Sequence, residues 1–363
     1  MLTFLLAAAL VADQPIQIDL NGDHGRQVIV DREPGVYLGH VSTVLLADRK
    51  SILAVYPQGH GTGPIVMKRS DDAGLTWSER LPTPASWATS KETPTLFRMG
   101  TESLILFSGL HPIRAARSSD DGRTWSELEP IGDFGGIVAM GGVADLGGGR
   151  FATFFHDDGR FLHADGEATD TFTLYQTNSD DAGATWSPTR EIWSGSDVHL
   201  CEPGVVVSPD GGTLALLLRE NRRVKRSHAM LSRDGAATWS DPHELPNALT
   251  GDRHIAAYAR DGRLVVTFRC MAPGDPWRGD WVAWVGAWDD LTPGGAEGGS
   301  GEPTYLVRLK DNLAGADCGY AGLEALPDGT LVATTYGAWS EGEQPFILSV
   351  RFTVRELDGL AAR

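Results

Sequence analysis

The chain of 363 residues has few cysteines and no long hydrophobic run after its first dozen residues. Its three cysteines, Cys201, Cys270 and Cys318, do not form a disulfide framework, although one pair plus a free thiol is possible in an oxidising compartment. No segment shows a sustained helical period of apolar residues. These absences argue against a disulfide-stapled, a helical or a membrane-embedded protein.

Positive charge is also scarce. The chain has 31 Lys and Arg against 48 Asp and Glu, which gives a formal net charge of −17. Such a charge repels phosphate backbones, and the basic run RRVKR at residues 222–226 is short. We interpret that run as a solvated turn and expect no nucleic-acid partner.

The apolar run at the start, MLTFLLAAALVA, is too short to span a bilayer and ends in small residues. It is typical of a signal peptide, with cleavage near Ala12. The alternative is an ordinary buried N-terminal strand. We expect a secreted or periplasmic protein with no membrane insertion after cleavage, and one mature domain over residues 13–363.

Glycine and tryptophan are abundant, with 44 and 11 copies, and one motif recurs. SDDAGLTW at residues 70–77 returns as SSDDGRTW at 118–125 and SDDAGATW at 179–186, and a degraded copy, SRDGAATW, occupies 232–239. Repeats at such spacing indicate arrays or propellers. We interpret Ser and Asp as caps of backbone amides in a turn and Trp as a wedge between blades. A calcium loop would need more oxygen ligands.

Around these repeats the sequence predicts six units of three strands each, bounded by Gly, Pro or Asp turns. The predicted strands are 42–47, 52–56, 65–69; 94–98, 103–108, 113–117; 137–145, 150–155, 172–177; 204–208, 213–219, 228–231; 255–259, 263–269, 281–288; and 323–326, 330–336, 346–352. This pattern is typical of an all-β, six-bladed β-propeller. A further strand at 26–30 would complete the last blade and close the ring.

The propeller geometry predicts which loops share a face. Strands alternate in direction, so the entries to first strands and the exits of second strands lie at the same mouth. The residues at these places are mostly polar: Tyr37, His40, His60, Lys91, Glu92, His111, residues 156–160, Glu202, Arg219, Glu220, Arg253, His254, Arg269, Asp317, Tyr320 and Tyr336. Converging polar groups at one mouth predict the binding site.

The repeats and the six units together resemble the sialidase (neuraminidase) superfamily, whose propellers carry such Asp-box or BNR repeats, over essentially the whole mature chain. CGYAGLEALPDGTLVATTYG, from Cys318, is similar to the family's sixth blade, which carries a nucleophilic Tyr. HLCEPGVVVSPDGGTLALLLREN, from His199, is similar to the blade that carries the partner Glu and one Arg of a triad.

The resemblance implies an exo-acting glycoside hydrolase for a terminal sialic acid or a related acidic sugar. Tyr320 would be the nucleophile and Glu202 its base, because a phenol with a pKa near 10 needs a base to become reactive. A neutral phenol suits an anomeric carbon that bears a carboxylate, since an attacking carboxylate would be repelled. Arg219 and Arg269 would bind that carboxylate, with Arg253 and Arg278 as competitors of Arg269.

The sequence departs from the family's pattern at two places. Gly39-His40 stands where the first blade usually has an Arg, and the loop YPQGHGTGP, from Tyr56, offers His60 where the family has an acid/base Asp. The proton donor is therefore displaced or different, with four candidates: Asp157, Asp158, His40 and His60. Further candidates for substrate binding are Glu92, His156, Arg160 and His254.

Three other interpretations remain. Cysteines beside site residues, together with His40, His60, His156 and His254, suggest zinc, but no ligand spacing supports it, and buried thiols or a Cys201–Cys318 bridge are favoured. We expect no metal and no cofactor. The missing catalytic elements favour a non-catalytic carbohydrate-binding propeller as one alternative. A uronate lyase with a His/Tyr acid–base pair is the other. The sugar, the linkage, retention against inversion at the anomeric carbon, and the oligomeric state stay open.

Overall fold

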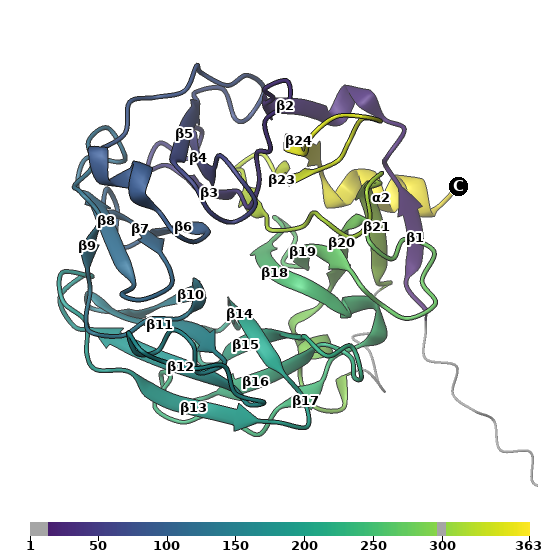
Figure 1. Cartoon of the computed structure of the whole chain (residues 1–363). Helices are drawn as coiled ribbons and strands as arrows, with labels where there is room; N and C mark the ends of the chain where they lie inside the picture. Colours follow the sequence, from purple (N-terminus) through teal and green to yellow (C-terminus); the bar gives the residue numbers. More distant parts are fainter. Residues whose placement is uncertain (1–13, 296–302) are drawn as a thin grey trace, which may run out of the picture.

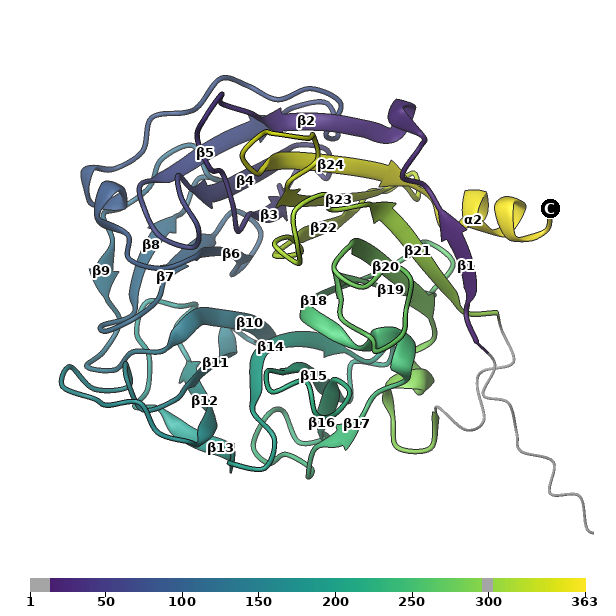
Figure 2. The same cartoon turned by 45° about the vertical axis from the view of Figure 1, so that its right-hand side comes forward.

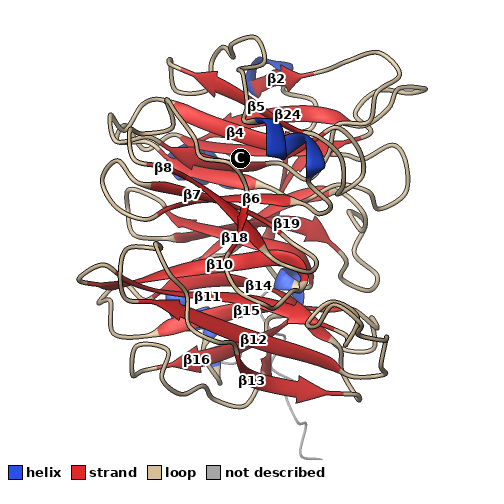
Figure 3. Cartoon of the chain, turned by 60° about the vertical axis from the view of Figure 1, so that its left-hand side comes forward, coloured by secondary structure: helices blue, strands red, loops and turns tan. Residues whose placement is uncertain are grey.

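The computed structural model describes residues 14–295 and 303–363, and these form an almost entirely β structure (Figure 3). Six sheets lie around a central axis as the blades of a propeller (Figure 1). The predicted fold class is therefore confirmed. The expected leader, residues 1–12, lies outside the described ranges.

The first three blades follow the predicted strands closely. Blade 1 contains β3 (Ser42–Leu45), β4 (Ile52–Pro57) and β5 (Ile65–Ser70); blade 2 contains β6 (Pro94–Arg98), β7 (Leu104–Ser108), β8 (Arg114–Ser118) and β9 (Glu129–Pro130); blade 3 contains β10 (Ile137–Gly147), β11 (Arg150–Asp157), β12 (Phe172–Ser179) and β13 (Arg190–Gly195). In blade 1 a single bridge between Met67 and Leu81 stands in place of a fourth strand.

The other three blades have the same meander. Blade 4 contains β14 (Leu200–Val207), β15 (Leu214–Glu220), β16 (His228–Ser232) and β17 (His243–Glu244); blade 5 contains β18 (Gly251–Tyr258), β19 (Leu264–Cys270), β20 (Trp281–Gly286) and β21 (Tyr305–Lys310); blade 6 contains β22 (Gly322–Ala325), β23 (Leu331–Gly337) and β24 (Phe346–Phe352). All neighbouring strands within these meanders are antiparallel.

The second strands read as continuous apolar runs because neighbouring blades cover both of their faces. Every residue of β4, β7 and β23 is buried. A strand with one solvated face would alternate instead. The core is therefore a ring of apolar layers between blades, and it holds the inner strands at fixed positions around the axis.

Two N-terminal strands add to the last two blades, and the one in blade 6 closes the ring (Figure 2). β2 (Gln27–Asp31) pairs antiparallel with β24, as predicted from the sequence. β1 (Ile16–Asp19) pairs parallel with β21 of blade 5 and was not predicted. Its four residues, IQID, do alternate apolar and polar side chains, but the segment is short and three of the four side chains are exposed.

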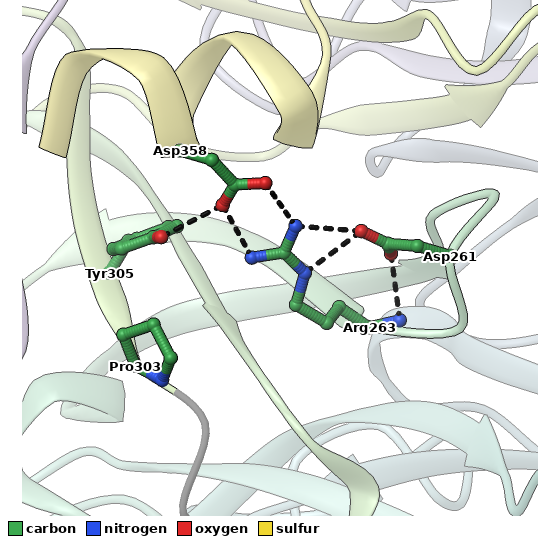
Figure 4. Close-up of a pocket in the computed structure, with 5 residues that line it drawn as sticks. All are labelled: Asp261, Arg263, Pro303, Tyr305 and Asp358. Atoms are coloured by element: carbon green, nitrogen blue, oxygen red, sulfur yellow. Dashed lines mark hydrogen bonds and ion pairs between the residues drawn. The ribbon is translucent and has the colours of Figure 1, made fainter. Parts of the chain in front are cut away.

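One α-helix, α2 (Val354–Ala361), follows the last strand and was also missed. Its signal is a capping box: Thr353 accepts a hydrogen bond from the Glu356 amide, and Glu356 accepts one from the Thr353 amide. Arg263, in the β18–β19 region, forms two hydrogen bonds of 2.7 and 2.8 Å with Asp358, to which Tyr305 also donates (Figure 4). These pairs line a surface cavity of about 580 Å³ and fasten α2 to blade 5.

The recurring motif has the predicted structural role. In the first copy the Gly74 amide donates to Ser70 Oγ at 2.8 Å, and the Thr76 amide and hydroxyl donate to Asp72. The same bonds recur around Asp120, Asp181 and Asp234. The degraded copy keeps the turn because Gly235 and Ala236 both have positive φ, so the glycine can take either place.

The Trp of the motif also packs as predicted, against the preceding blade. Trp186 meets Phe107 edge-on at 5.6 Å between ring centres, and Trp239 meets Phe154 at 5.3 Å. Each repeat thus ties its own blade to the one before it.

Candidate active site

Several inner strands begin, at the mouth of the propeller, with a residue in an unusual backbone conformation. Non-glycine residues with positive φ stand at the start of four of them: His40 at 53°, Val138 at 50°, Glu202 at 52° and Arg253 at 56°. β10, β14 and β18 have register shifts at these places. Bulges redirect side chains, and residues in sparsely populated backbone regions cluster at functional sites.

Two of the predicted residues form a direct pair across the channel. The Tyr320 hydroxyl, ahead of β22, donates a hydrogen bond of 2.5 Å to Glu202 Oε1 in β14. Arg219 Nη1 donates to the same carboxylate oxygen at 2.7 Å. Tyr320 is 8% exposed and Glu202 is 3% exposed. The sequence therefore brings a phenol, a carboxylate and a guanidinium together in a largely dry site.

The electrostatics keep the proton on the phenol. Burial, and next the charge of Glu202, raise the pKa of Tyr320 well above 10. Burial alone would raise the pKa of Glu202, but the Arg219 guanidinium and the Tyr320 hydroxyl outweigh it, and the pKa of Glu202 lies below its ordinary value. At neutral pH the pair is a neutral phenol beside an ionised base.

The arginines of blades 4 and 5 share one buried carboxylate. Asp252, 1% exposed, accepts from Arg269 Nε at 2.7 Å and from Arg223 Nη2 at 2.7 Å, and Arg219 Nε lies 3.3 Å away. Arg269 also donates to the carbonyl of Ala316. Burial opposes the ionisation of Asp252, but the guanidiniums hold its pKa at about 2. Asp252 thus fixes Arg219 and Arg269 beside the Tyr320–Glu202 pair.

Arg253, in β18, packs on the ring of Tyr320. Its guanidinium lies over the Tyr320 ring, 5.8 Å from the ring centre, and Nη2 donates to the Met140 carbonyl at 3.3 Å. Arg253 is 4% exposed, and burial lowers its pKa. Arg253 Nη1, Arg219 Nε and Glu202 Oε2 find no hydrogen-bond partner among the described residues. Buried donors and acceptors without partners indicate a place for a ligand.

A second cluster joins blades 1 and 6. His40 stacks on Tyr336 at 4.7 Å and lies 4.4 Å from the Tyr320 ring centre, so it stands beside the nucleophile candidate. His60 meets His40 edge-on at 4.7 Å. Asp317 accepts hydrogen bonds from the hydroxyls of Tyr37, at 2.7 Å, and Tyr336, at 3.0 Å.

The HDDGR run is held by its own loop. The Asp157 carboxylate accepts from the amides of Gly159, Phe161 and Leu162, and Asp158 pairs with Arg160 Nε at 2.8 Å. No hydrogen bond or ion pair joins either aspartate to Tyr320, Glu202 or His40 in the described part of the chain. Asp157, Asp158 and Arg160 are therefore held by contacts within their own loop.

The side chains of the remaining predicted residues mostly contact backbone groups around the mouth. His254 Nε2 lies 2.8 Å from the Leu249 carbonyl, and His156 Nδ1 lies 3.4 Å from the Glu202 amide. Burial lowers the pKa of both histidines, to about 4 for His156, so both are neutral at pH 7. Glu92 accepts from the Thr93 amide, and burial raises its pKa.

The cysteines are buried free thiols, so the considered Cys201–Cys318 bridge is absent. Within residues 14–295 and 303–363, no cluster of three or more His, Cys, Asp or Glu side chains is arranged to hold a metal ion. None of the helices in those ranges is long and apolar enough to cross a membrane.

Sequence reasoning missed two members of the site. Asp252 directly precedes the predicted Arg253 at the entry to a first strand, and this position could have identified it as a site residue. Arg223 belongs to the basic run that we interpreted as a solvated turn. Arg222 and Lys225 are exposed, as expected for such a turn, but Arg223 points inward to Asp252. Charge composition alone does not separate the inward arginine from its neighbours.

The sequence model of the BNR repeat-like domain family matches residues 88–269, which is half of the chain. The chain belongs to this family. No curated protein matches this BNR repeat-like protein at the level of sequence.

Solved structures share the fold of this BNR repeat-like protein. A protein of unknown function from Dyadobacter fermentans matches with a TM-score of 0.67 and 14% identity, over 90% of this chain and 97% of that one. A mutant NanB sialidase from Streptococcus pneumoniae matches with a TM-score of 0.60 and 14% identity, over 91% and 71%. Trypanosoma rangeli sialidase, as a covalent intermediate with 2,3-difluorosialic acid, matches with 0.56 and 13%, over 91% and 56%. The fold is that of sialidases.

Proposed function

We propose that this protein is a glycoside hydrolase that releases a terminal sialic acid or a related acidic sugar through a tyrosyl intermediate. The observation that carries the proposal is the 2.5 Å hydrogen bond from the Tyr320 hydroxyl to the buried, ionised Glu202. A nucleophile within hydrogen-bond reach of its base is the arrangement that covalent catalysis needs.

The chemistry follows from the proton's position. Tyr320 holds its proton at rest, so its oxygen is neutral when an anionic sugar binds. As that oxygen forms a bond to the anomeric carbon, the hydroxyl proton passes to Glu202 Oε1, and the glycosidic bond breaks as an acid/base residue gives a proton to the leaving oxygen. Arg219, bound to the same carboxylate oxygen, offsets the charge of Glu202 before the transfer. Water then attacks the anomeric carbon and gives a proton to the same acid/base residue, and the sugar leaves Tyr320, which recovers its proton from Glu202.

The buried guanidiniums support an anionic substrate. The Arg253 guanidinium lies over the Tyr320 ring, and its Nη1 has no partner in the described part of the chain. Arg219 and Arg269 are held beside the pair by Asp252. Arginine binds carboxylates through two parallel hydrogen bonds and stays charged when buried. The covalent sialic-acid intermediate of the Trypanosoma rangeli enzyme supports the same chemistry on this fold.

The direct test is incubation of the purified protein with 2,3-difluorosialic acid, followed by intact-mass and peptide mass spectrometry. The expected result is one sugar-acid adduct on the peptide that contains Tyr320. The sugar acid should also be released from sialylated glycans. Glycan binding without turnover or adduct would instead establish a carbohydrate-binding propeller.

A uronate lyase is the second candidate, because His40 packs 4.4 Å from Tyr320 and offers an imidazole beside a phenol. A lyase would yield an unsaturated, ultraviolet-absorbing sugar from a uronate-bearing glycan and no adduct on Tyr320.

We propose export to the cell exterior or periplasm from the N-terminal sequence. N-terminal sequencing of the exported protein, expected to begin at Asp13, tests this proposal.

A further inference from the structure

One cluster at the mouth has no part in the Tyr320–Glu202 chemistry described above. It consists of Tyr37, His60 and Asp317, which come from three different segments of blades 1 and 6. His60 lies in the loop between β4 and β5, and its side chain is 66% exposed. His60 meets His40, which in turn packs on Tyr320, so its exposed imidazole lies at the mouth where it can reach the outer part of a bound substrate.

The loop that carries His60 has a defined shape. The Gln58 amide donates to the Pro64 carbonyl at 2.9 Å, and Gly59, Gly61 and Gly63 all have positive φ. At Gly61 a Cβ atom would lie 3.4 Å from Thr93 Oγ1, so this loop packs closely on blade 2. The imidazole is therefore held at the mouth by a tight turn.

Hydrogen bonds assign the two nitrogens of His60 different roles. Tyr37 donates its one hydroxyl proton to Asp317 at 2.7 Å, and the Tyr37 oxygen lies 2.7 Å from His60 Nδ1. That oxygen must then accept the Nδ1–H, and Asp317 Oδ1 lies 3.5 Å from the same nitrogen. The network fixes the proton on Nδ1 and leaves Nε2 for proton exchange with a ligand.

The other candidates for the proton donor are less suited. His40 is 5% exposed, and burial lowers its pKa to about 3, so it carries no extra proton near neutral pH. Asp157 is occupied by three backbone amides, and Asp158 is paired with Arg160. His60, by contrast, has a raised pKa, caused first by its contact with Asp317.

We propose that His60 is the acid/base residue of the reaction, and that Asp317 and Tyr37 are positioning residues that hold its imidazole. This inference rests on the proposed glycoside hydrolase activity. In the first step His60 Nε2–H gives its proton to the glycosidic oxygen as the bond to the anomeric carbon breaks. In the second step Nε2 takes a proton from the water that attacks the tyrosyl-bound carbon.

The first experiment compares two substrates of one sugar acid: an aryl glycoside, whose leaving group needs little protonation, and a glycoside of lactose, whose leaving group needs a proton. His60→Ala should slow release from the lactoside about 10²- to 10⁴-fold, the usual contribution of acid–base catalysis. The aryl glycoside should lose less than about tenfold in the first step. His163→Ala, which removes an exposed histidine from the β11–β12 loop, is the matched control.

The second experiment measures the pH profile of kcat/KM. The groups that face His60 are the Tyr37 hydroxyl, the His40 ring and the charged side chains of Asp317, Arg269 and Glu92. The acid form of His60 is needed, so activity should fall as pH rises through its raised pKa. Asp317→Asn should move this alkaline limb to lower pH, which a purely structural loss would not do. Tyr37→Phe should lower turnover of the lactoside more than that of the aryl glycoside.

The outcomes separate this inference from the proposed function. If the wild-type protein turns over both substrates and His60→Ala still cleaves the lactoside within about threefold of wild type, the role of His60 is refuted and the hydrolase stands. An equal loss on both substrates, or an unmoved alkaline limb in Asp317→Asn, also refutes it. If the wild-type protein cleaves neither substrate and forms no Tyr320 adduct, the proposed hydrolase and the role of His60 both fail.

Discussion

The turns that carry the recurring motif and the mouth of the ring are built from similar residue types in opposite ways. In the repeats each carboxylate is exposed or half-buried and receives hydrogen bonds from its own turn, as the Thr185 amide and hydroxyl supply to Asp181. Around Tyr320 at the mouth the polar atoms are buried, and Glu202 Oε2 and Arg253 Nη1 have no partner among the described residues. A repeated, self-satisfied turn stabilises the fold, whereas a buried unsatisfied group is kept for a ligand.

The largest expected effect is that of Tyr320→Phe on catalysis. Loss of one hydroxyl should lower kcat about 10³-fold or more, since it removes the proposed nucleophile, while the ring and its packing stay. Glu202 retains its bond to Arg219, so Tm should change little. Steady-state kinetics measure the expected loss of kcat, and thermal unfolding of the same preparation measures the expected small change in Tm. Turnover near the wild-type rate would contradict the assignment of catalysis to the mouth and of a structural role to the repeats.

Asp252→Asn should affect stability and substrate binding together. Removal of the charge leaves Arg219, Arg223 and Arg269 without their shared counter-charge in a buried site, at a cost of about 3 kcal/mol in the free energy of unfolding. KM for an acidic substrate should rise as the guanidiniums lose their positions. Urea unfolding and kinetics measure the two effects. Wild-type KM in a folded variant would show that Asp252 does not position the binding arginines.

Ser179→Ala should reveal the opposite behaviour in a repeat. The buried Ser179 hydroxyl accepts from the Gly183 amide at 2.8 Å, so its loss should cost about 1 kcal/mol of stability. The kcat and KM should match wild type, because the turn holds blades together and contacts no site residue. Denaturant unfolding measures the stability and steady-state kinetics measure kcat and KM. A lowered kcat in a variant of wild-type stability would contradict the purely structural role of this turn.

The smallest effect concerns acid stability. Hydrogen bonds from the Thr238 hydroxyl and amide hold the pKa of Asp234 at about 2, below its ordinary value. Because the folded pKa is depressed, this contribution is present above the unfolded pKa near 4 and is lost as pH falls toward about 2. Asp234→Asn should flatten the loss of stability over that range. An unchanged slope in acid-unfolding curves would contradict the role of the carboxylate charge.

The sequence predicted the fold more completely than the site. Regular spacing, turn residues and apolar runs are local signals, and they located all six blades and the closing strand near residues 27–31. β1 escaped because its partner, β21, lies almost 300 residues away and its own side chains are mostly exposed. The helix α2 was not predicted because its capping box is a short sequence signal that directly follows a long β pattern.

The site was predicted in part because propeller geometry assigns residues to a face without giving distances. Tyr320 and Glu202 were paired by resemblance, and the structure brings them into contact. Asp157 and Asp158 lie at the correct end of a strand, yet loop amides and Arg160 occupy them. The bulges at Glu202 and Arg253 depend on backbone angles that residue type does not encode. β14 and β18 accordingly begin four residues earlier than predicted.

The pairing of β2 with β24 also sets the order in which the chain can be completed. Val28 lies opposite Ser349, so this N-terminal strand has no partner until nearly the whole polypeptide has been synthesised. Contacts of such sequence separation form slowly, and an unpaired edge is prone to pair with other chains. The growing chain thus carries an open edge through most of its synthesis. A truncation before Phe346 would leave that edge permanently open, which makes aggregation the expected fate of fragments.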